Sequence, residues 1–409
     1  MKKLKVIVKI VLFFTIYIGA QYGIRYAILD DTRTISRVMM HDLYAQEQNI
    51  DILFCGASHC QLGFDTEVLD RTFDKNTFNA GSSSQGLETT LALIKEADAY
   101  NDLQQVYVDL DYSIVMRQVP NLESIYIIAD YMKLSPRKVE YLLNATSAEY
   151  YVNSFMPIHK GRGYMKNLRG IPELLHKKMQ SGYRDYMDVD SSYAGKGHIA
   201  SRTVIENGSL WSEDTLSEMD FTIPETQQEY LHEIIRYCQE QNIQLTFVSI
   251  PVTDFHLAHI TNYDEYVDTI TNFLDKYDVK YYDFNLCDRS MLQIDEDAYF
   301  NDDNHLNADG AVNFSKAFAE FFMGEIDGAD LFYETLLDRW MAEKVRVLGV
   351  EVHQNNEVLE VYPILNRTET EENQVPECEV RRKENGYAVT VKMNGMITNQ
   401  IEIKDEELR

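Results

Sequence analysis

Short apolar runs alternate with helix-like segments between residues 51 and 323, and this alternation limits the choice of fold more than any other feature of the chain. Apolar residues recur at helical spacing between the runs, as at Leu87, Leu91 and Ile94. Strands that alternate with helices indicate a doubly wound parallel sheet. We therefore expect a flavodoxin-like α/β domain with five parallel strands. The runs with the length of buried strands are 51–55, 77–80, 106–110, 245–250 and 280–284.

Two short polar motifs follow the first and the fifth of these expected strands. Gly56-Ala57-Ser58-His59 comes directly after the first, and Asp302-Asp303-Asn304-His305 comes after the fifth and before a helix-like run. Sites in open parallel sheets gather beyond the carboxyl ends of the strands. A serine nucleophile, a histidine base and an aspartate that orients the base are what acyl transfer through a serine needs.

These motifs and a third one resemble the SGNH (GDSL-like) hydrolase superfamily. The resemblance covers about 51–110 and 228–323, and the last motif is the most specific because it is similar to the family's D-x-x-H-x-N-x-x-G block. A membrane anchor before the domain makes the chain similar to the surface-polymer acylation branch. That branch includes alginate O-acetylation proteins and the D-alanyl-transfer protein of teichoic acid modification. The matching segments are 54–59, 78–86 and 302–310.

The resemblance implies a role for each motif residue and no cofactor. Ser58 would attack an acyl carbonyl, His305 would move its proton, and Asp302 would hold the imidazole, with Asp303 as the other candidate orienter. Backbone amides at Ser58 and near Gly81–Ser84 would form the oxyanion hole. We predict oxyanion or substrate contacts for Gly81, Ser84 and His59. For His59, a capping or packing role is an equal alternative.

The chain departs from the family pattern in two places. Ser84 stands where the second block usually has a glycine, although Gly81 and Gly86 are near. The third block, usually Gly-x-Asn-Asp, is replaced by 109–113, which contains no asparagine. These losses favour a transferase over a general lipase. They also motivate the alternative of a non-catalytic polymer-binding or scaffold protein on a degenerate SGNH fold.

Charge and composition exclude several other functions. The chain has 38 basic and 66 acidic residues and a net charge of −28, which argues against nucleic acid as a partner. Its five cysteines do not resemble a disulfide framework, and Cys60 is expected to be a buried thiol rather than a nucleophile. His256 and His259 lie three residues apart, but no third ligand is evident, so we predict no metal site.

The N-terminus is expected to be a membrane anchor over 1–27. Lysines flank the apolar run from Val6 to Ile24, which is close to the length needed to cross a bilayer. Positive charges before the run place the rest of the chain outside the cell, as a single-pass protein of the cell membrane. A signal peptide cleaved after Ala20 and a buried cytosolic helix are the alternatives. Residues 28–50 are interpreted as a stalk or a short helix.

The expected catalytic domain, 51–330, is interrupted by a mostly helical insertion over 112–226. The insertion holds ten of the 27 tyrosines, which we interpret as packing residues or as a carbohydrate platform. Within it, 158–184 carries seven Lys/Arg and one acidic residue. This basic segment is either a solvated helix face or a site for anionic headgroups or an anionic polymer.

The end of the chain, 345–409, is expected to be a small antiparallel β module. Val345/Val347, Val350/Val352 and Val389/Val391 alternate as strand residues do. Asn385-Gly386 between apolar runs is a strong hairpin signal.

Taken together, these features predict a membrane-anchored serine acyltransferase or esterase that modifies a cell-envelope polysaccharide or an anionic polymer. By resemblance, acetyl is preferred over D-alanyl as the acyl group. A multispanning membrane O-acyltransferase is the expected donor partner.

Overall fold

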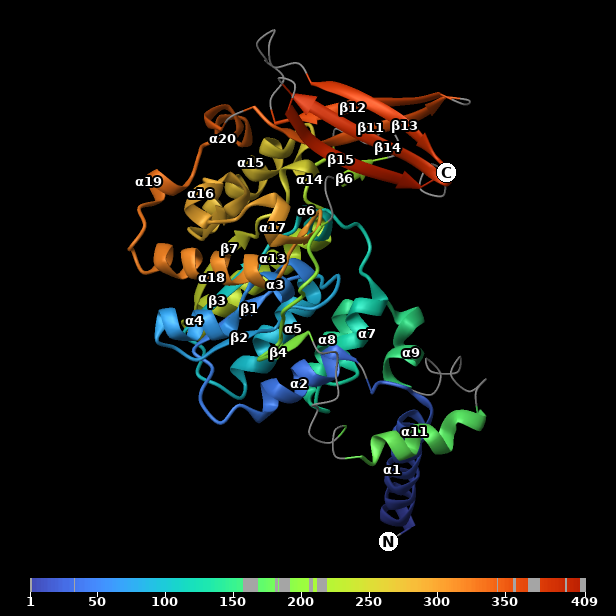
Figure 1. The fold of residues 1–409 in the computed structure, drawn as a ribbon. Helices are drawn as coiled ribbons and strands as arrows, with labels where there is room; N and C mark the ends of the chain where they lie inside the picture. The colour runs from blue at the N-terminus through green and yellow to red at the C-terminus, as the bar shows by residue number, and fades with distance from the viewer. Residues whose placement is uncertain are drawn as a thin grey trace.

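The computed structural model describes residues 2–32, 34–156, 168–180, 183, 192–205, 209–211, 219–343, 345–355, 358–366, 376–393 and 396–404. One long helix, α1 (Lys2–Ile28), projects from one end of an α/β domain, and β-strands of the C-terminal region lie at the other end (Figure 1). α1 is long and apolar enough to cross a membrane.

A five-stranded parallel sheet forms the centre of the domain. The strands are adjacent in the order β2-β1-β3-β7-β8, which confirms the expected flavodoxin-like sheet. The chain runs outward from β1 to β2, returns to β3, and continues to β7 and β8. The strand bounds are β1 (Ile52–Cys55), β2 (Thr77–Asn79), β3 (Gln105–Asp109), β7 (Gln244–Ser249) and β8 (Lys280–Asp283).

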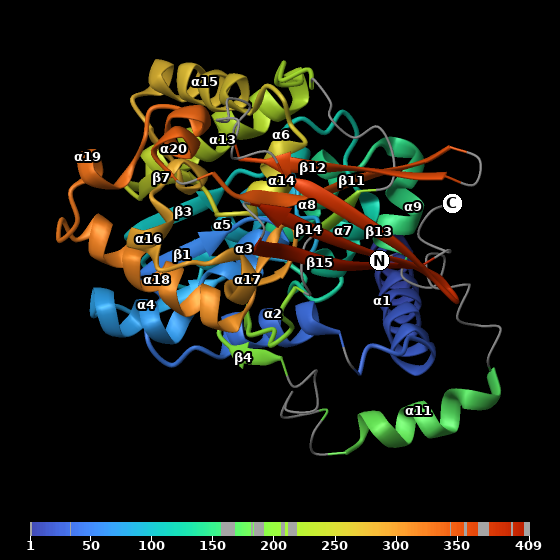
Figure 2. The same ribbon diagram turned by 45° about the horizontal axis from the view of Figure 1, so that its top comes forward.

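Helices cover both faces of the sheet, because alternate strand residues point to opposite sides. Ile52 and Phe54 of β1 belong to one buried cluster, which also contains residues of α4 and α18. Leu53 and Cys55 belong to the other, with α2, α5, α13 and α15. Figure 2 shows the sheet between α4 and α18 on one side and α13 and α15 on the other. The helix bounds are α4 (Thr66–Phe73), α5 (Leu87–Asp98), α13 (Glu225–Gln241), α15 (Tyr263–Leu274) and α18 (Ala308–Phe322).

Residues 28–50 contribute to this core. They contain α2 (Ile35–Ala45), whose Met39, Met40 and Leu43 are buried in the same cluster as Leu53. Of the two interpretations of this segment, a short helix describes it. Burial of its apolar face holds it against the domain, so it does not stand apart as a stalk.

The insertion begins with a run of helices and continues as short strands. Tyr112, Tyr126, Tyr131 and Tyr141 pack against the core, which favours packing over a carbohydrate platform for these four. Tyr164 and Tyr186 lie outside the described residues. The bounds are α6 (Tyr112–Val115), α7 (Leu122–Ala129), α8 (Pro136–Ala145), α9 (Tyr151–Phe155), α11 (Ile171–Lys178), β4 (Tyr193–Gly195), β5 (His198–Ile199) and β6 (Ser209–Trp211).

The basic segment 158–184 is described only in part. Lys177 is exposed, but Lys178 is buried and donates hydrogen bonds to the carbonyl oxygens of Tyr26 and Leu29 at the end of α1. Lys178 is therefore a structural residue rather than part of a solvated face. Lys160, Arg162, Lys166 and Arg184 lie outside the described residues.

The C-terminal strands form two small sheets, and residues of both, such as Val350 and Val389, share one buried cluster. β11 and β12 pair antiparallel, and β13, β14 and β15 form an antiparallel meander. β6 of the insertion pairs parallel to β11, a contact between distant parts of the chain. The predicted hairpin is present: Lys383 pairs with Gly386, so Glu384 and Asn385 form the turn. The bounds are β11 (Val347–Asn355), β12 (Val358–Leu365), β13 (Glu377–Lys383), β14 (Gly386–Met393) and β15 (Met396–Lys404).

Shorter elements connect the strands to the site. They are α3 (Ser58–Gly63), α14 (Asp254–Ala258), α16 (Arg289–Leu292), α17 (Glu296–Tyr299), β9 (Phe300–Asp302), β10 (His305–Leu306), α19 (Gly328–Leu331) and α20 (Leu336–Ala342).

Candidate active site

Three side chains from the two sequence motifs meet at the carboxyl edge of the sheet. Ser58 begins α3, directly beyond β1. Its Oγ lies 2.7 Å from Nε2 of His305, and Nδ1 of His305 lies 2.8 Å from Oδ1 of Asp302. This chain of contacts allows His305 to take the hydroxyl proton of Ser58 while Asp302 stabilises the imidazolium that forms.

A tight β-hairpin brings Asp302 and His305 together. The two residues end β9 and begin β10, and they face each other as an antiparallel pair. The amide of Asn304 donates to Oδ1 of Asp302 at 3.1 Å, and Nδ2 of Asn301 donates to Oδ2 at 2.8 Å. Burial opposes ionisation of Asp302, but the hydrogen bond and charge of His305 together with hydrogen bonds from Asn304 and Asn301 outweigh it and lower the pKa of Asp302 to about 2. The group is therefore a carboxylate at neutral pH.

Asp303, the other predicted orienter, takes a different position. Its carbonyl oxygen accepts hydrogen bonds from the amide of Thr253 at 3.0 Å and from the Thr253 hydroxyl at 2.6 Å. The partner that the structure gives to Nδ1 of His305 is Asp302. Through these hydrogen bonds, the backbone of Asp303 holds the hairpin against the loop after β7.

Two glycines allow the loops around Ser58 to approach closely. A Cβ on Gly56 would lie 2.6 Å from Cβ of Asp109, and a Cβ on Gly81 would lie 2.7 Å from the amide nitrogen of Gln61. Real Cβ atoms do not approach other atoms so closely, so any larger residue would push these loops apart. Gly56 therefore sets the path from β1 into α3, and Gly81 sets the packing of the loop after β2.

The predicted oxyanion donors differ in availability. The amide of Gly81 donates to Oδ1 of Asn79 at 2.9 Å, so it is already engaged. Ser84 has a positive φ of 51°, and its carbonyl oxygen accepts from Nη1 of Arg117 at 3.1 Å. First-turn amides of a helix have no acceptor within the helix, and the amide of Ser58 is one of these. Among the predicted donors, the amides of Ser58 and Ser84 remain candidates for binding an oxyanion, since the contact of Ser84 involves its carbonyl oxygen.

His59 forms a second histidine–aspartate pair beside the first. Its Nδ1 lies 3.2 Å from Oδ2 of Asp111, and its ring centroid lies 5.0 Å from that of His305. Both partners are buried, and burial lowers the pKa of His59 despite the nearby carboxylate. Sequence reasoning missed Asp111. The segment 109–113 was considered only because it lacks the family's asparagine. The position of Asp111 directly after β3, at the same sheet edge, was the available signal.

Asp109 is a buried carboxyl group between these elements. Its Oδ1 accepts from the amide of Ile250 at 3.3 Å, and its Oδ2 has no hydrogen-bond partner among the residues that the structure describes. Burial, and then the charge of Asp111, raise the pKa of Asp109 well above its usual value. Burial thus favours the uncharged form of Asp109, which packs against Gly56.

The remaining nucleophile and metal candidates have other partners. Nε2 of His256 lies 3.0 Å from the hydroxyl of Tyr112, and Nδ1 of His259 lies 2.6 Å from the carbonyl oxygen of Phe255. No group of three or more potential metal ligands occurs in the described part of the chain. All five cysteines are free, and burial raises the pKa of Cys60 well above its usual value. Cys60 is thus a poor nucleophile.

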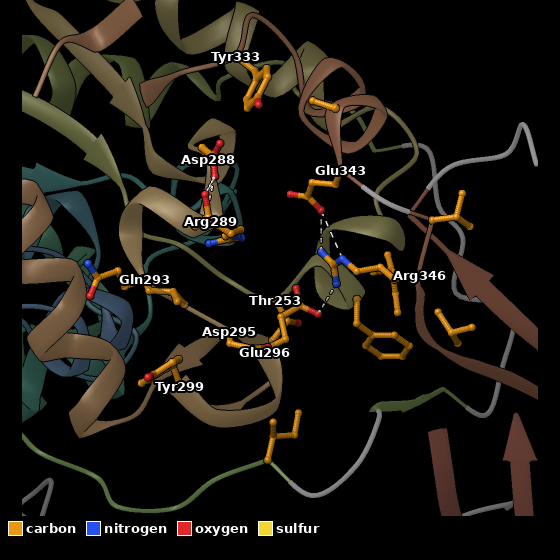
Figure 3. A pocket seen from close by; sticks show the side chains of 18 of the residues that line it. Thr253, Asp288, Arg289, Gln293, Asp295, Glu296, Tyr299, Tyr333, Glu343 and Arg346 are labelled. Atoms are coloured by element: carbon orange, nitrogen blue, oxygen red, sulfur yellow. Dashed lines mark hydrogen bonds and ion pairs between the residues drawn. The ribbon is translucent and has the colours of Figure 1, made fainter. Parts of the chain in front are cut away.

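A cavity of about 950 Å³ lies beside the hairpin between α16, α17 and the start of β11 (Figure 3). Charged side chains line it, including Arg289, Glu296, Glu343 and Arg346. Arg346 forms an ion pair with Glu343 at 3.1 Å, as the dashed lines show. It also donates a hydrogen bond to the buried carboxylate of Asp254. Thr253, which holds the carbonyl of Asp303, also lines this space. The cavity therefore borders the loop that carries Asp302 and His305.

Part of the chain is similar to a known family. Residues 215–323 match the family model of the DltD protein. This stretch contains β7, β8, Asp302 and His305, and it ends before the C-terminal strands; Ser58 lies outside it. No curated protein matches the chain.

One solved structure that matches is described as a platelet activating factor from Streptococcus pneumonia. It is 13% identical, covers 74% of this chain and 98% of its own, and has a TM-score of 0.31.

Proposed function

We propose that this protein is an extracytoplasmic, membrane-anchored serine acyltransferase or esterase that modifies a teichoic acid. The observation that carries the proposal is the contact of 2.7 Å between Ser58 Oγ and His305 Nε2, with Asp302 on the far side of the imidazole. The family-model match over 215–323 supports the polymer class, since it includes two of these three residues. Residues Ser58, His305 and Asp302 are the proposed catalytic residues.

The proposed reaction has two halves that use the same groups. In the first, Ser58 Oγ attacks the acyl carbonyl while His305 Nε2 takes the hydroxyl proton. The tetrahedral intermediate then collapses, and His305 gives that proton to the leaving group, which leaves an acyl-serine ester. In the second half, a polymer hydroxyl or water attacks this ester. His305 takes the proton of the attacking group and returns it to Ser58.

The acyl group is proposed to be D-alanyl. The resemblance of the sequence motifs favoured acetyl, but the DltD match supports the branch that modifies teichoic acids and gives no support to alginate O-acetylation. A multispanning membrane O-acyltransferase remains the proposed donor partner. The net charge of −28 opposes approach of a phosphate-rich polymer, and salt would weaken this repulsion. Polymer modification should therefore be faster at moderate salt than at low salt.

Replacement of the proposed nucleophile tests the function directly. Full-length Ser58→Ala should lose D-alanylation of teichoic acid in cells that depend on this chain. Ser83→Ala is the matched control, because Ser83 is an exposed serine in the nearby loop after β2. Wild-type levels of D-alanyl ester in the Ser58→Ala cells would refute the proposal.

A non-catalytic scaffold is the competing function, motivated by the missing third-block asparagine. A serine-reactive fluorophosphonate probe separates the two. Stoichiometric labelling at Ser58 that disappears in His305→Ala supports catalysis. A folded protein that takes no label would favour the scaffold.

A further inference from the structure

The end of α1 is fixed to the helical insertion. Nζ of Lys178 donates to the carbonyl oxygens of Tyr26 at 2.8 Å and Leu29 at 2.5 Å, which are at the carboxyl end of α1. Arg25 pairs with Asp130 of the insertion at 3.2 Å. These contacts place the carboxyl end of α11 at the level where α1 ends. The position of α11 relative to a membrane is therefore set by the position of α1.

α11 and the turn before it have one apolar face and one polar face. Leu168, Ile171, Leu175 and Met179 recur at the spacing of a single helix face. Leu168 is 61% exposed and Met179 is 64% exposed, and neither side chain belongs to the core clusters of the described residues.

The opposite face of α11 is charged. It carries Arg169, Glu173 and Lys177, with Lys177 and Glu173 paired at 3.6 Å. α11 crosses the upper part of α1 in the view of Figure 1, and Figure 2 shows α11 set apart from the α/β domain. An amphipathic helix in this position suits a membrane surface.

α9 extends the apolar surface along α1 itself. The hydroxyl of Tyr17 lies 3.4 Å from Sδ of Met156, the residue that follows α9. Tyr17 is inside the apolar run of α1, about 16 Å along the helix axis from Ile28 at 1.5 Å per residue. Val152 and Phe155 of α9 lie close to Met156 in the sequence, and they are 48% and 41% exposed to solvent. The contact with Tyr17 therefore places the end of α9 beside the apolar part of α1, which is suited to lipid.

We propose that Val152, Phe155, Leu168, Ile171, Leu175 and Met179, which we call the α9–α11 face, lie in the membrane leaflet at which α1 ends. The apolar side chains contact lipid acyl chains, and Arg169 and Lys177 lie at the level of the headgroups. The occupant is lipid because the ends of α9 and α11 both contact α1, whose apolar side chains are themselves exposed. The proposal rests on α1 spanning a membrane and does not depend on acyl transfer.

Fluorescent labels at single introduced cysteines test this contact. Leu168→Cys, Met179→Cys and Phe155→Cys are made in full-length protein that also carries Cys378→Ser, because the other four cysteines are buried. Each variant is labelled with an environment-sensitive dye and reconstituted in phosphatidylcholine–phosphatidylglycerol vesicles that contain doxyl-labelled lipid. Ile24→Cys in α1 is the positive control. Val119→Cys, 72% exposed in the same insertion, is the aqueous control.

At Leu168, Met179 and Phe155 we expect a blue-shifted emission and quenching by doxyl lipid that approach the values at Ile24, whereas Val119 stays unquenched. Labels at Leu168 and Met179 that behave like the label at Val119 would overturn the proposal. Labels that are shielded only in native membranes, and not in pure lipid vesicles, would also overturn it in favour of a protein partner. An unchanged thermal transition for each variant shows that the domain is folded, independently of any catalytic activity.

Discussion

Two aspartate–histidine pairs lie side by side at the edge of the sheet, and they differ in surroundings rather than in chemistry. In the Asp302–His305 pair, the aspartate side chain is 48% exposed, and the imidazole reaches the hydroxyl of Ser58. In the Asp111–His59 pair, both side chains are less than 10% exposed. The distances from imidazole Nδ1 to the carboxylate oxygen are similar, 2.8 and 3.2 Å.

Under the proposed mechanism, environment rather than residue type separates the proposed base His305 from His59. His305 has a nucleophile on one nitrogen and a carboxylate on the other, as a general base requires. Burial lowers the pKa of His59, which favours its uncharged form beside His305. We therefore expect the two pairs to respond very differently to the same substitutions, and each experiment below tests this difference.

The largest difference is expected between the two histidines. His305→Ala should reduce turnover of a D-alanyl or acetyl ester by about 10⁵- to 10⁶-fold, because the base and the nucleophile act as a unit. His59→Ala should cost less than about 10²-fold, since it removes a neighbour of the base. Initial rates with purified full-length protein measure both. Losses of equal size would show that the second pair also takes part in proton transfer.

The next difference concerns the aspartates that orient the histidines. Asp302→Asn should lower the rate by about 10²- to 10⁴-fold, because the amide stabilises the wrong tautomer of His305 and cannot stabilise the imidazolium. Asp303→Asn is the matched control and should leave the rate near wild type, because Asp303 contacts Thr253 through its backbone carbonyl. A larger loss at Asp303 than at Asp302 would reverse the assigned orienter.

The pH dependence of stability tests whether the buried histidines stay neutral. Burial, and then the charge of His59, lower the pKa of His256 from 6.5 to about 4. The unfolded chain binds a proton near pH 6.5 and the folded one does not. This contribution to the free energy of unfolding is therefore complete above pH 6.5 and is lost as the pH falls towards 4. The shift corresponds to a loss of up to about 3 kcal/mol.

Urea unfolding at pH 7 and at pH 4.5 measures this loss. His256→Gln should flatten the dependence on pH while it keeps a polar partner for the hydroxyl of Tyr112. The same slope in the wild type and the variant would mean that other groups account for it.

The smallest effect is expected at Asp111, on stability rather than on rate. Its side chain pairs with His59 and also accepts the amide of Ser113 at 2.7 Å as the N-cap of α6. Asp111→Ala should lower the free energy of unfolding by about 1–2 kcal/mol through loss of the cap. Asp111→Asn should retain most of the stability, because asparagine also caps a helix well. Equal destabilisation by both variants would show that the pair with His59 matters more than the cap.

The sequence predicts the parts of the structure that depend on local patterns. Apolar runs and helical spacing predict the five strands and their helices, and strand order then places Ser58 and His305 at one edge. The pairing of β6 with β11 could not be predicted, because no local pattern in a three-residue strand of the insertion identifies the strand with which it pairs. The contact of Asp111 with His59 was missed for the same reason. It joins a residue of α3 to the N-cap residue of α6, and only the packed structure determines the directions of the two side chains.

The parts of the proposed triad differ in how far apart they are in the chain. Asp302 and His305 are joined by a four-residue hairpin, whereas Ser58 and His305 are separated by 247 positions. Short loops close quickly, whereas distant contacts must wait for the elements between them to assemble. The histidine–aspartate pair can therefore form early as the protein folds, and the serine joins it only when the parallel sheet is complete. The time at which Ser58 becomes reactive to a fluorophosphonate would then report the last step of folding.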